Sequence, residues 1–277
     1  HMAAGAVRMN AGDAFVCAGV ESMTRVPMGG YNPMPNPALH ASFPAAYISM
    51  GQTAENVAER YQMTRESQEA FAVESHKKAA AAHAAGKFKD EIVTVDGVDT
   101  DGCIRPDTNL EGLAGLKPAF SATGTVTAGT SSPLTDGAAA TLVCSAEYAR
   151  EHNLTPLAVI KSMAINGCDP DVMGLGPIGA TRKALKRAGL EMGDIDIIEI
   201  NEAFASQSLA CINDLGMDMA RVNLDGGAIA LGHPLGATGA RITGKAAALL
   251  KREGKKYALS TQCIGGGQGI TTIMEAA

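Results

Sequence analysis

The second half of the chain alternates short apolar runs with segments in which apolar residues recur at helical spacing. Five apolar runs predict strands, over 157–165, 195–200, 223–230, 257–262 and 269–275. Helical spacing predicts helices between them, over 178–188, 203–215 and 237–252. Because strands and helices of this length alternate in layered sheets, we expect residues 149–277 to form an α/β domain.

The first half shows only part of such a pattern. The run at 14–20 is apolar on both faces, which predicts a buried strand of a parallel sheet. A second strand is expected at the end of 126–144, after a polar turn at 129–137. Residues 3–12 are typical of the last turns of a helix that Gly12 closes.

Residues 24–120 interrupt this domain. Five prolines and almost no periodicity over 24–46 predict an ordered loop whose apolar residues cover a protein surface. Thr64 opens a capping-box sequence and so predicts a helix start. Beyond the loop we expect helices over 53–61 and 64–86, a strand over 91–95 and a second loop over 99–116.

Composition places the chain among globular proteins, with 46% hydrophobic and 19% charged residues over 277 positions. The net charge of −6 and the lack of a basic stripe argue against nucleic acid as a partner. No apolar run approaches the roughly 20 residues that span a bilayer, so we expect no membrane span. The six cysteines are widely spaced and predict neither a metal site nor a disulfide scaffold, which favours a reducing, cytoplasmic location.

Two polar residues stand where predicted elements meet. Asn201 directly follows the strand 195–200, at an edge where α/β sheets bind ligands, although it could simply cap the next helix. His233 lies in a glycine-rich turn between a predicted strand and a predicted helix, beside Pro234. An imidazole there is a candidate base or hydrogen-bond donor, and the alternative is a turn residue without a role.

A formal dinucleotide-binding motif at 174–179 is rejected. The residues before it do not predict a strand, which the motif requires. Pro177 also removes a backbone N–H from the turn that would hold the pyrophosphate. A helix that begins at the proline explains this segment better.

Cys263 ends a predicted strand and precedes three glycines. A free cysteine is usually a small buried hydrophobe, but the N–H groups of such a turn can converge on an anion. We expect Cys263, Asn201 and His233 to meet at the ends of three strands of one parallel sheet. A thiol, an amide and an imidazole together suit carbonyl chemistry, with proton transfer and stabilisation of an oxyanion.

These segments together resemble the thiolase family. Asn-Glu-Ala-Phe at 201–204, Gly-His-Pro at 232–234 and Cys-Ile-Gly-Gly-Gly at 263–267 carry the resemblance, which covers essentially the whole chain. It implies a layered α/β/α/β/α fold. Residues 1–148 would be an incomplete first domain, with a loop domain that binds coenzyme A inserted at about 25–121, and residues 149–277 the second domain.

The resemblance also implies roles for individual residues. Cys263 would act as general acid and base, and His233 as activator of the nucleophile and oxyanion donor. Asn201 would hold a water in the same oxyanion hole, and the Gly265 N–H would contribute to a second. The positions that match contacts to coenzyme A or the acyl chain are Met50, Arg105, Phe120, Ala128, Ser132, Met173 and Phe204.

The implied activity is the thiolytic cleavage of 3-ketoacyl-CoA in fatty-acid β-oxidation, or the reverse Claisen condensation. Coenzyme A and acyl-CoA are substrates, and no permanently bound cofactor is expected. The family's nucleophile is another cysteine, at the start of a helix before 14–20, and no cysteine stands there. The chain is therefore expected to be N-terminally truncated and inactive alone.

Three alternatives and a set of partners complete these expectations. Ser49 stands where acetoacetyl-CoA-specific biosynthetic members can carry histidine, which favours a broad-chain enzyme. A ketoacyl synthase would have histidine or asparagine in place of Cys263. A coenzyme-A-binding fragment without catalysis is the third alternative. At full length we expect a homo-oligomer, a dimer or tetramer, with a hydratase/dehydrogenase subunit as a candidate partner.

Overall fold

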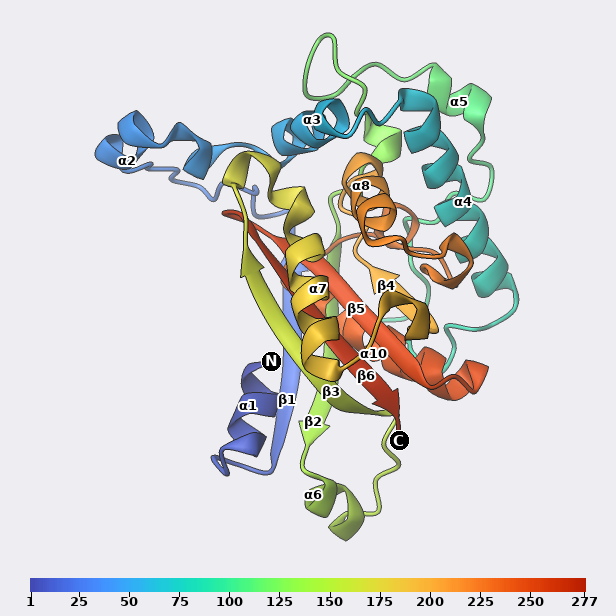
Figure 1. Cartoon of the computed structure of the whole chain (residues 1–277). Coiled ribbons are helices and arrows are strands. Elements are labelled where there is room, and N and C mark those ends of the chain that lie inside the picture. Colours follow the sequence, from blue (N-terminus) through green and yellow to red (C-terminus); the bar gives the residue numbers. More distant parts are fainter.

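The computed structural model describes residues 1–277, and a four-stranded mixed sheet forms the centre of the second half (Figure 1). Its strand order is β3-β6-β5-β4, in which only β4 and β5 run parallel. The strands are β3 (Ala158–Gly167), β4 (Ile197–Ile200), β5 (Tyr257–Ile264) and β6 (Gln268–Ala276). The prediction of an all-parallel sheet is therefore wrong.

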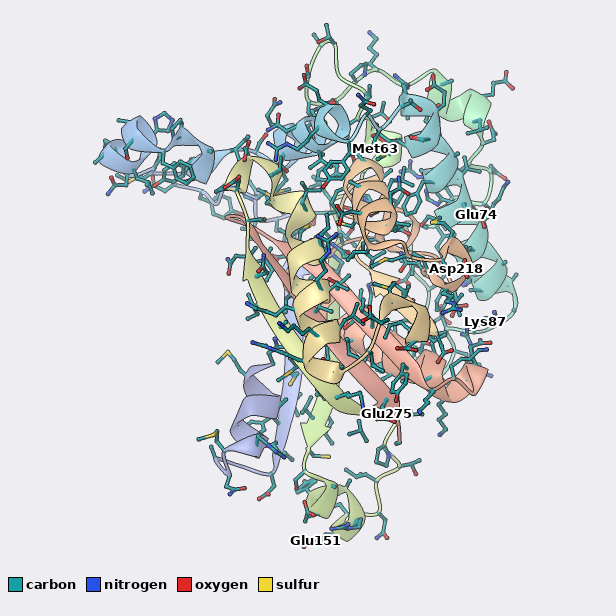
Figure 2. All side chains as sticks on the ribbon, viewed as in Figure 1. Met63, Glu74, Lys87, Glu151, Asp218 and Glu275 are labelled. Atoms are coloured by element: carbon teal, nitrogen blue, oxygen red, sulfur yellow. The ribbon has the colours of Figure 1, made fainter.

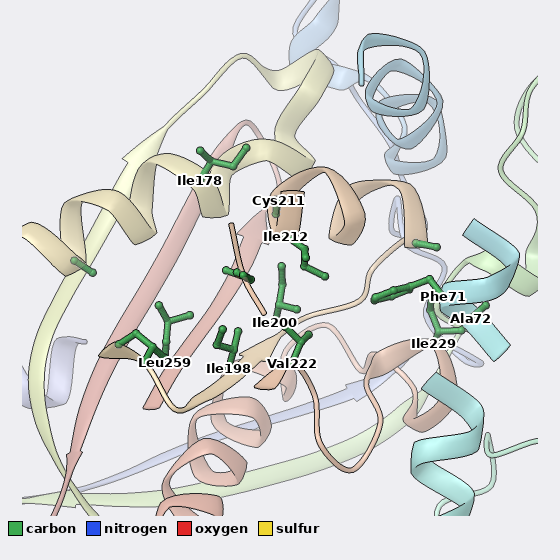
Figure 3. Close-up of a cluster of buried hydrophobic side chains, with 14 of the residues drawn as sticks. Phe71, Ala72, Ile178, Ile198, Ile200, Cys211, Ile212, Val222, Ile229 and Leu259 are labelled. Carbon is green, nitrogen blue, oxygen red and sulfur yellow. The ribbon is translucent and has the colours of Figure 1, made fainter. Parts of the chain in front are cut away.

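Helices cover both faces of this sheet. On one face, α7 (Gly176–Ala188) and α8 (Ala205–Leu215) enclose Ile198 and Leu259 (Figure 3). On the other face, α10 (Thr238–Glu253) packs on Ile197. Successive isoleucines of β4 thus enter different cores, as strand alternation requires. Each such buried side chain contributes about 1.5–3 kcal/mol, so the two cores fix the sheet between the helices.

The second sheet consists of β1 (Ala14–Ser22) and β2 (Asp136–Cys144), which pair antiparallel. Its alternation leaves Val16 and Val20 exposed, so the predicted burial in a parallel sheet is also wrong. Helix α10 contacts both sheets. Sheet, helix, sheet and outer helices therefore lie in layers, with α1 (Met2–Arg8) beside the first sheet and α6 (Ala146–Glu151) beyond the end of β2 (Figure 1).

Close backbone approach fixes how β1 meets the turn before α10. A Cβ atom on Gly19 would lie 1.7 Å from the carbonyl oxygen of Gly236. Glu21 Oε2 accepts a hydrogen bond of 3.1 Å from the Gly236 N–H nearby. The first half of the chain is thereby held against the segment that follows His233.

The segment between β1 and β2 divides into an arm and a helical part. The arm carries α2 (Pro37–Ser42) and η1 (Pro44–Tyr47) and extends away from the body (Figure 1). Tyr31 and Met34 on it are about four-fifths exposed, so the arm does not cover a surface as predicted. The helical part contains α3 (Met50–Arg60), α4 (Arg65–Ala84) and α5 (Leu110–Ala114).

Helix boundaries follow local chemistry. The Thr64 side chain caps α4 by accepting a bond of 3.2 Å from the Ser67 N–H, as the sequence predicts. Helix α1 ends at Arg8, with Met9 as its C-cap, and does not reach Gly12, because Asn10 already adopts a left-handed φ of 56°. The short 3₁₀ segments are η2 (Ala128–Thr130), η3 (Pro170–Leu175), η4 (Met192–Asp194) and η5 (Met219–Arg221).

Two predicted strands do not form. Residues 91–95 contain only an isolated bridge between Val95 and Val98. In 223–230, the left-handed φ values of Asn223 (45°) and Gly226 (84°) exclude a strand, and the apolar end forms α9 (Ala228–Leu231) instead. No helix of the molecule has both the length and the apolar character that a membrane span requires.

Candidate active site

Asn201 and His233 are in direct contact. The Asn201 backbone N–H donates to the Thr261 carbonyl at 3.0 Å, so Asn201 prolongs the pairing of β4 with β5. Its side chain is fully buried, and its Nδ2 lies 3.3 Å from His233 Nε2. The structure thus brings together two of the predicted site residues, which are 32 positions apart in the chain.

Two threonines hold His233. Its backbone N–H donates to Thr135 Oγ1 at 3.1 Å, and its ring Nδ1 lies 2.6 Å from Thr238 Oγ1. Because the Thr238 hydroxyl donates its one proton to the Pro234 carbonyl at 3.0 Å, it accepts from His233 Nδ1–H. Nε2 is therefore the unprotonated nitrogen, and it accepts from the Asn201 amide.

Burial keeps this imidazole neutral. Burial, with the positive charge of Arg241 acting in the same direction, lowers the pKa of His233 to about 4. At neutral pH the ring accordingly offers a lone pair at Nε2, directed at the Asn201 side. A neutral histidine with a fixed tautomer can take a proton from a neighbouring acid.

The position of His233 differs from the predicted strand–helix turn. It follows the short helix α9, and the turn passes through Gly232 at a left-handed φ of 95°. A Cβ atom on Gly232 would lie 2.6 Å from Thr135 Cγ2. Sequence analysis missed Thr135 and Thr238. Thr238 starts a predicted helix close to His233, but no pattern indicates the contact of Thr135 across nearly one hundred positions.

Cys263 lies near the end of β5, opposite Gly269 of β6. The turn that follows is a hairpin in which Gly266 and Gly267 have φ values of 85° and 91°, which favour glycine. Cys263 is two residues, about 7 Å, beyond Thr261, the residue that Asn201 pairs with. Burial raises the pKa of the Cys263 thiol to about 12, so the thiol carries its proton at neutral pH.

The side chain of Cys263 has no hydrogen bond to His233. Strand alternation places it with Leu259, on the face of the sheet that α7 and α8 cover. His233, which contacts Asn201 directly, is held instead by Thr238 at the start of α10. A common cavity of all three residues remains a prediction.

Several predicted coenzyme-contact positions lie close together. Phe120 and Phe204 stack edge to face with ring centroids 5.7 Å apart. The ring of Phe120 also covers Gly51, next to Met50, because a Cβ atom on Gly51 would lie 2.0 Å from it. The Ser132 N–H donates to the carbonyl of Ala203, the residue before Phe204, at 3.0 Å.

The other three positions lie on separate short segments. Ala128 starts η2, and Met173 is buried in η3. Arg105 is exposed, and its backbone N–H donates to His76 Nδ1 on α4 at 3.1 Å. His76 is thus a third residue beside the candidate site that the sequence patterns did not indicate. Burial lowers its pKa, with Arg105 acting in the same direction, so its ring remains a neutral acceptor.

Comparison with known proteins identifies relatives of the chain. The family model for the thiolase N-terminal domain matches residues 1–147, and that for the thiolase C-terminal domain matches residues 154–276. A 3-ketoacyl-CoA thiolase of Marinomonas sp. (strain MWYL1) is 49% identical over 288 residues, which span 99% of this chain and 73% of that protein.

Solved structures give the same result. Human mitochondrial 3-ketoacyl-CoA thiolase in complex with CoA superposes with a TM-score of 0.89 at 40% identity, over 99% of this chain and 73% of that chain. A second structure of the human enzyme gives a TM-score of 0.90 at 40% identity, over 99% and 74% of the two chains. Fold and sequence therefore agree on one family.

Proposed function

The chain belongs to the thiolase family, and we propose that it serves the thiolytic cleavage of 3-ketoacyl-CoA to acetyl-CoA and a shortened acyl-CoA in fatty-acid β-oxidation, or the reverse Claisen condensation. The observation that carries this proposal is the contact of Asn201 Nδ2 with the unprotonated Nε2 of His233 at 3.3 Å. It supplies the base and the amide that acyl transfer between thiols requires.

His233 would remove the proton of the attacking thiol. Its low pKa leaves Nε2 free to accept that proton, and the bond from Nδ1 to Thr238 holds the ring in place as the imidazolium forms. After the attack, the N–H at Nε2 would donate to the oxygen that becomes negative. Asn201 Oδ1 is buried and accepts no hydrogen bond from the protein, which supports its binding a water at this oxyanion.

Cys263 would handle the second proton. Its raised pKa keeps the thiol protonated, which suits a group that protonates the departing acetyl-CoA enolate at carbon. The Cys263 thiolate formed in this step would then accept the proton of the incoming coenzyme A thiol. Gly265 lies in the exposed turn with open space beside its Cα, where its N–H could donate to a second oxyanion. One such donor is worth roughly 2.7–4 kcal/mol.

Coenzyme A would lie along the inserted helical part. Met50, Phe120, Phe204 and Met173 would line the acyl and pantetheine pocket, and Ser132, Ala128 and Arg105 would contact the coenzyme. The aromatic pair and its contact with α3 support this grouping. Ser49 caps α3 by accepting from the Gln52 N–H at 3.3 Å, so a serine there has a structural role that fits a broad-chain enzyme.

The proposal also includes the partners of the protein and its location in the cell. The family resemblance supports a homo-oligomer and a hydratase/dehydrogenase subunit as partners. The six cysteines are free, which agrees with a cytoplasmic location.

The attacking thiolate is proposed not to come from this chain. Cys211 is fully buried against the Gly174 carbonyl, and burial raises the pKa of its thiol. Cys17 and Cys144 lie within strands of the first sheet, and Cys103 and Cys168 in loops. None of these thiols hydrogen-bonds to His233 or Asn201.

A thiolysis assay beside a coenzyme A titration tests this proposal. We expect the chain to bind coenzyme A, with Phe120→Ala weakening binding, and to show negligible cleavage of acetoacetyl-CoA or of longer 3-ketoacyl-CoA. Turnover at a normal enzymatic rate would contradict the assignment of the nucleophile. Absence of coenzyme A binding would contradict the assignment of the pocket.

A further inference from the structure

The carboxylate of Glu202, next to Asn201, accepts three hydrogen bonds inside the protein. Its donors are the Ser75 hydroxyl at 2.6 Å, Asn223 Nδ2 at 2.7 Å and the Ile229 N–H at 3.1 Å. Glu202 is only 2% exposed, and no cation pairs with it. Ser75 belongs to α4 and Ile229 to α9. Asn223 follows Val222, which forms an isolated bridge with Ile198 of β4.

One donor connects Glu202 to the last residue of β4. Asn223 Oδ1 accepts from the Ile200 N–H at 2.9 Å, and its Nδ2 donates to the Ile200 carbonyl at 3.0 Å. The Asn223 side chain thus makes the two hydrogen bonds to the backbone of Ile200 that a neighbouring strand would otherwise make. Its left-handed φ of 45° is held by these bonds and by Glu202.

The other donors connect Glu202 to the segment that leads to His233. Ile229 belongs to α9, whose end at Leu231 is followed by Gly232 and His233. The Ser75 hydroxyl accepts from the Gly227 N–H at 3.1 Å while it donates to Glu202. A Cβ atom on Gly227 would lie 2.1 Å from the carboxyl carbon, so the backbone is packed directly on Glu202.

We propose that Glu202 is a positioning residue whose carboxylate holds the end of β4 and the start of α9 at the separation that lets Asn201 reach His233. Asn201 directly follows β4, and His233 comes shortly after α9. The Glu202 carboxylate connects these two elements. It touches neither the imidazole nor the substrate-facing amide, and acts through backbone and asparagine contacts. The role assigned to it rests on the proposed function of the pair.

The chemistry of the three donors makes the carboxylate hard to replace. A glutamine has the same shape but offers one acceptor oxygen and one NH₂ group. In either orientation its NH₂ faces an N–H, that of Ile229 or that of Asn223. A buried unsatisfied donor is destabilising, and the segment can relieve it by moving away from Glu202. Burial raises the pKa of Glu202, and the three donors oppose that shift.

The test is ¹⁵N-edited NMR of the His233 imidazole in the full chain, as the wild type and as Glu202→Gln. The signal is assigned with His233→Asn. Glu199→Gln is the matched control, because Glu199 is an equally buried glutamate of the same segment that makes no bond to α9. Ser75→Ala provides a second, milder variant that removes one donor.

In the wild type we expect a neutral ring, protonated at Nδ1, that titrates near pH 4. In Glu202→Gln the titration midpoint should rise by at least one pH unit, because water reaches the ring and the bond from Asn201 is lost. Ser75→Ala should shift it in the same direction by less, and Glu199→Gln should leave it unchanged. These readouts require no turnover, so they remain valid if the chain proves not to serve thiolysis.

An unchanged His233 titration in a folded Glu202→Gln would overturn the proposal. If Glu202→Gln does not fold, Ser75→Ala decides, and an unchanged His233 signal there would overturn it equally. An equal shift in Glu199→Gln would show a general response to loss of a buried carboxyl, and would overturn it too.

Discussion

Glu199 lies two residues before Asn201 on the α10 side of β4, and its side chain is 1% exposed. Burial raises its pKa from 4.5 to about 8, which Arg241 and Lys245 oppose only in part. The folded protein therefore keeps this carboxyl protonated at neutral pH, while the unfolded chain ionises it above about pH 4.5. The ionisation of this one residue therefore makes the free energy of unfolding depend on pH.

The sign of that dependence is fixed by the raised pKa. The contribution of Glu199 to stability is complete below the unfolded pKa and is lost as pH rises through about 8. Glu199→Gln, which cannot ionise, should lose less stability between pH 5 and pH 8. The difference should reach the order of a few kcal/mol, since one pKa unit corresponds to about 1.4 kcal/mol. Urea unfolding across this range measures it, and parallel pH profiles would refute the assignment.

At the scale of elements, Gly19 sets how closely β1 approaches the turn before α10. A methyl group there would meet the backbone carbonyl of Gly236, which cannot rotate away. We expect Gly19→Ala to destabilise the protein by about 1–3 kcal/mol and to lower the melting temperature by several degrees.

Gly5→Ala in α1 is the matched control for Gly19→Ala. No atom lies within 4 Å of the position of its added Cβ, and alanine favours the helix by roughly 0.5–1 kcal/mol. A thermal melt of both variants separates the effects. A Gly19→Ala protein as stable as Gly5→Ala would mean that β1 does not pack on this turn.

Sequence patterns predicted the elements whose information is local. Helices α7, α8 and α10 and strands β3, β5 and β6 combine clear periodicity with glycine or proline boundaries. The run 223–230 was misjudged because Ala228–Leu231 is apolar enough for a strand or a short helix. Its conformation is decided by Glu202 and Ser75, which are distant in sequence. Val93 and Val95 have β-favouring side chains but no strand to pair with, and they remain exposed.

The candidate site, like the fold, could be predicted from the sequence only where the information is local. Asn201 and His233 were found because polar residues stood out at the ends of apolar elements. Thr135 was not, because its contact depends on how the two halves of the chain pack. The same packing decides where the Cys263 side chain points, which a one-dimensional pattern does not contain.

At the scale of the whole molecule, His233 stands where the two halves meet. Its backbone is held by Thr135 of the first half, and its ring by Thr238 of α10, the helix between the sheets.

A groove of about 2170 Å³ also lies among β1, β2, β3 and α10. Charged side chains such as Glu74, Lys87 and Glu151 occupy the outside of the molecule (Figure 2).

The central claim is that the thiol of Cys263 shares a cavity with Asn201 and His233. The most direct measurement is a crystal structure of the chain soaked with acetoacetyl-CoA. We expect the thioester to bind beside His233, and Cys263 Sγ to lie within about 6 Å of His233 Nε2, two hydrogen-bond lengths. A greater separation, or a thioester bound away from His233, would contradict the account.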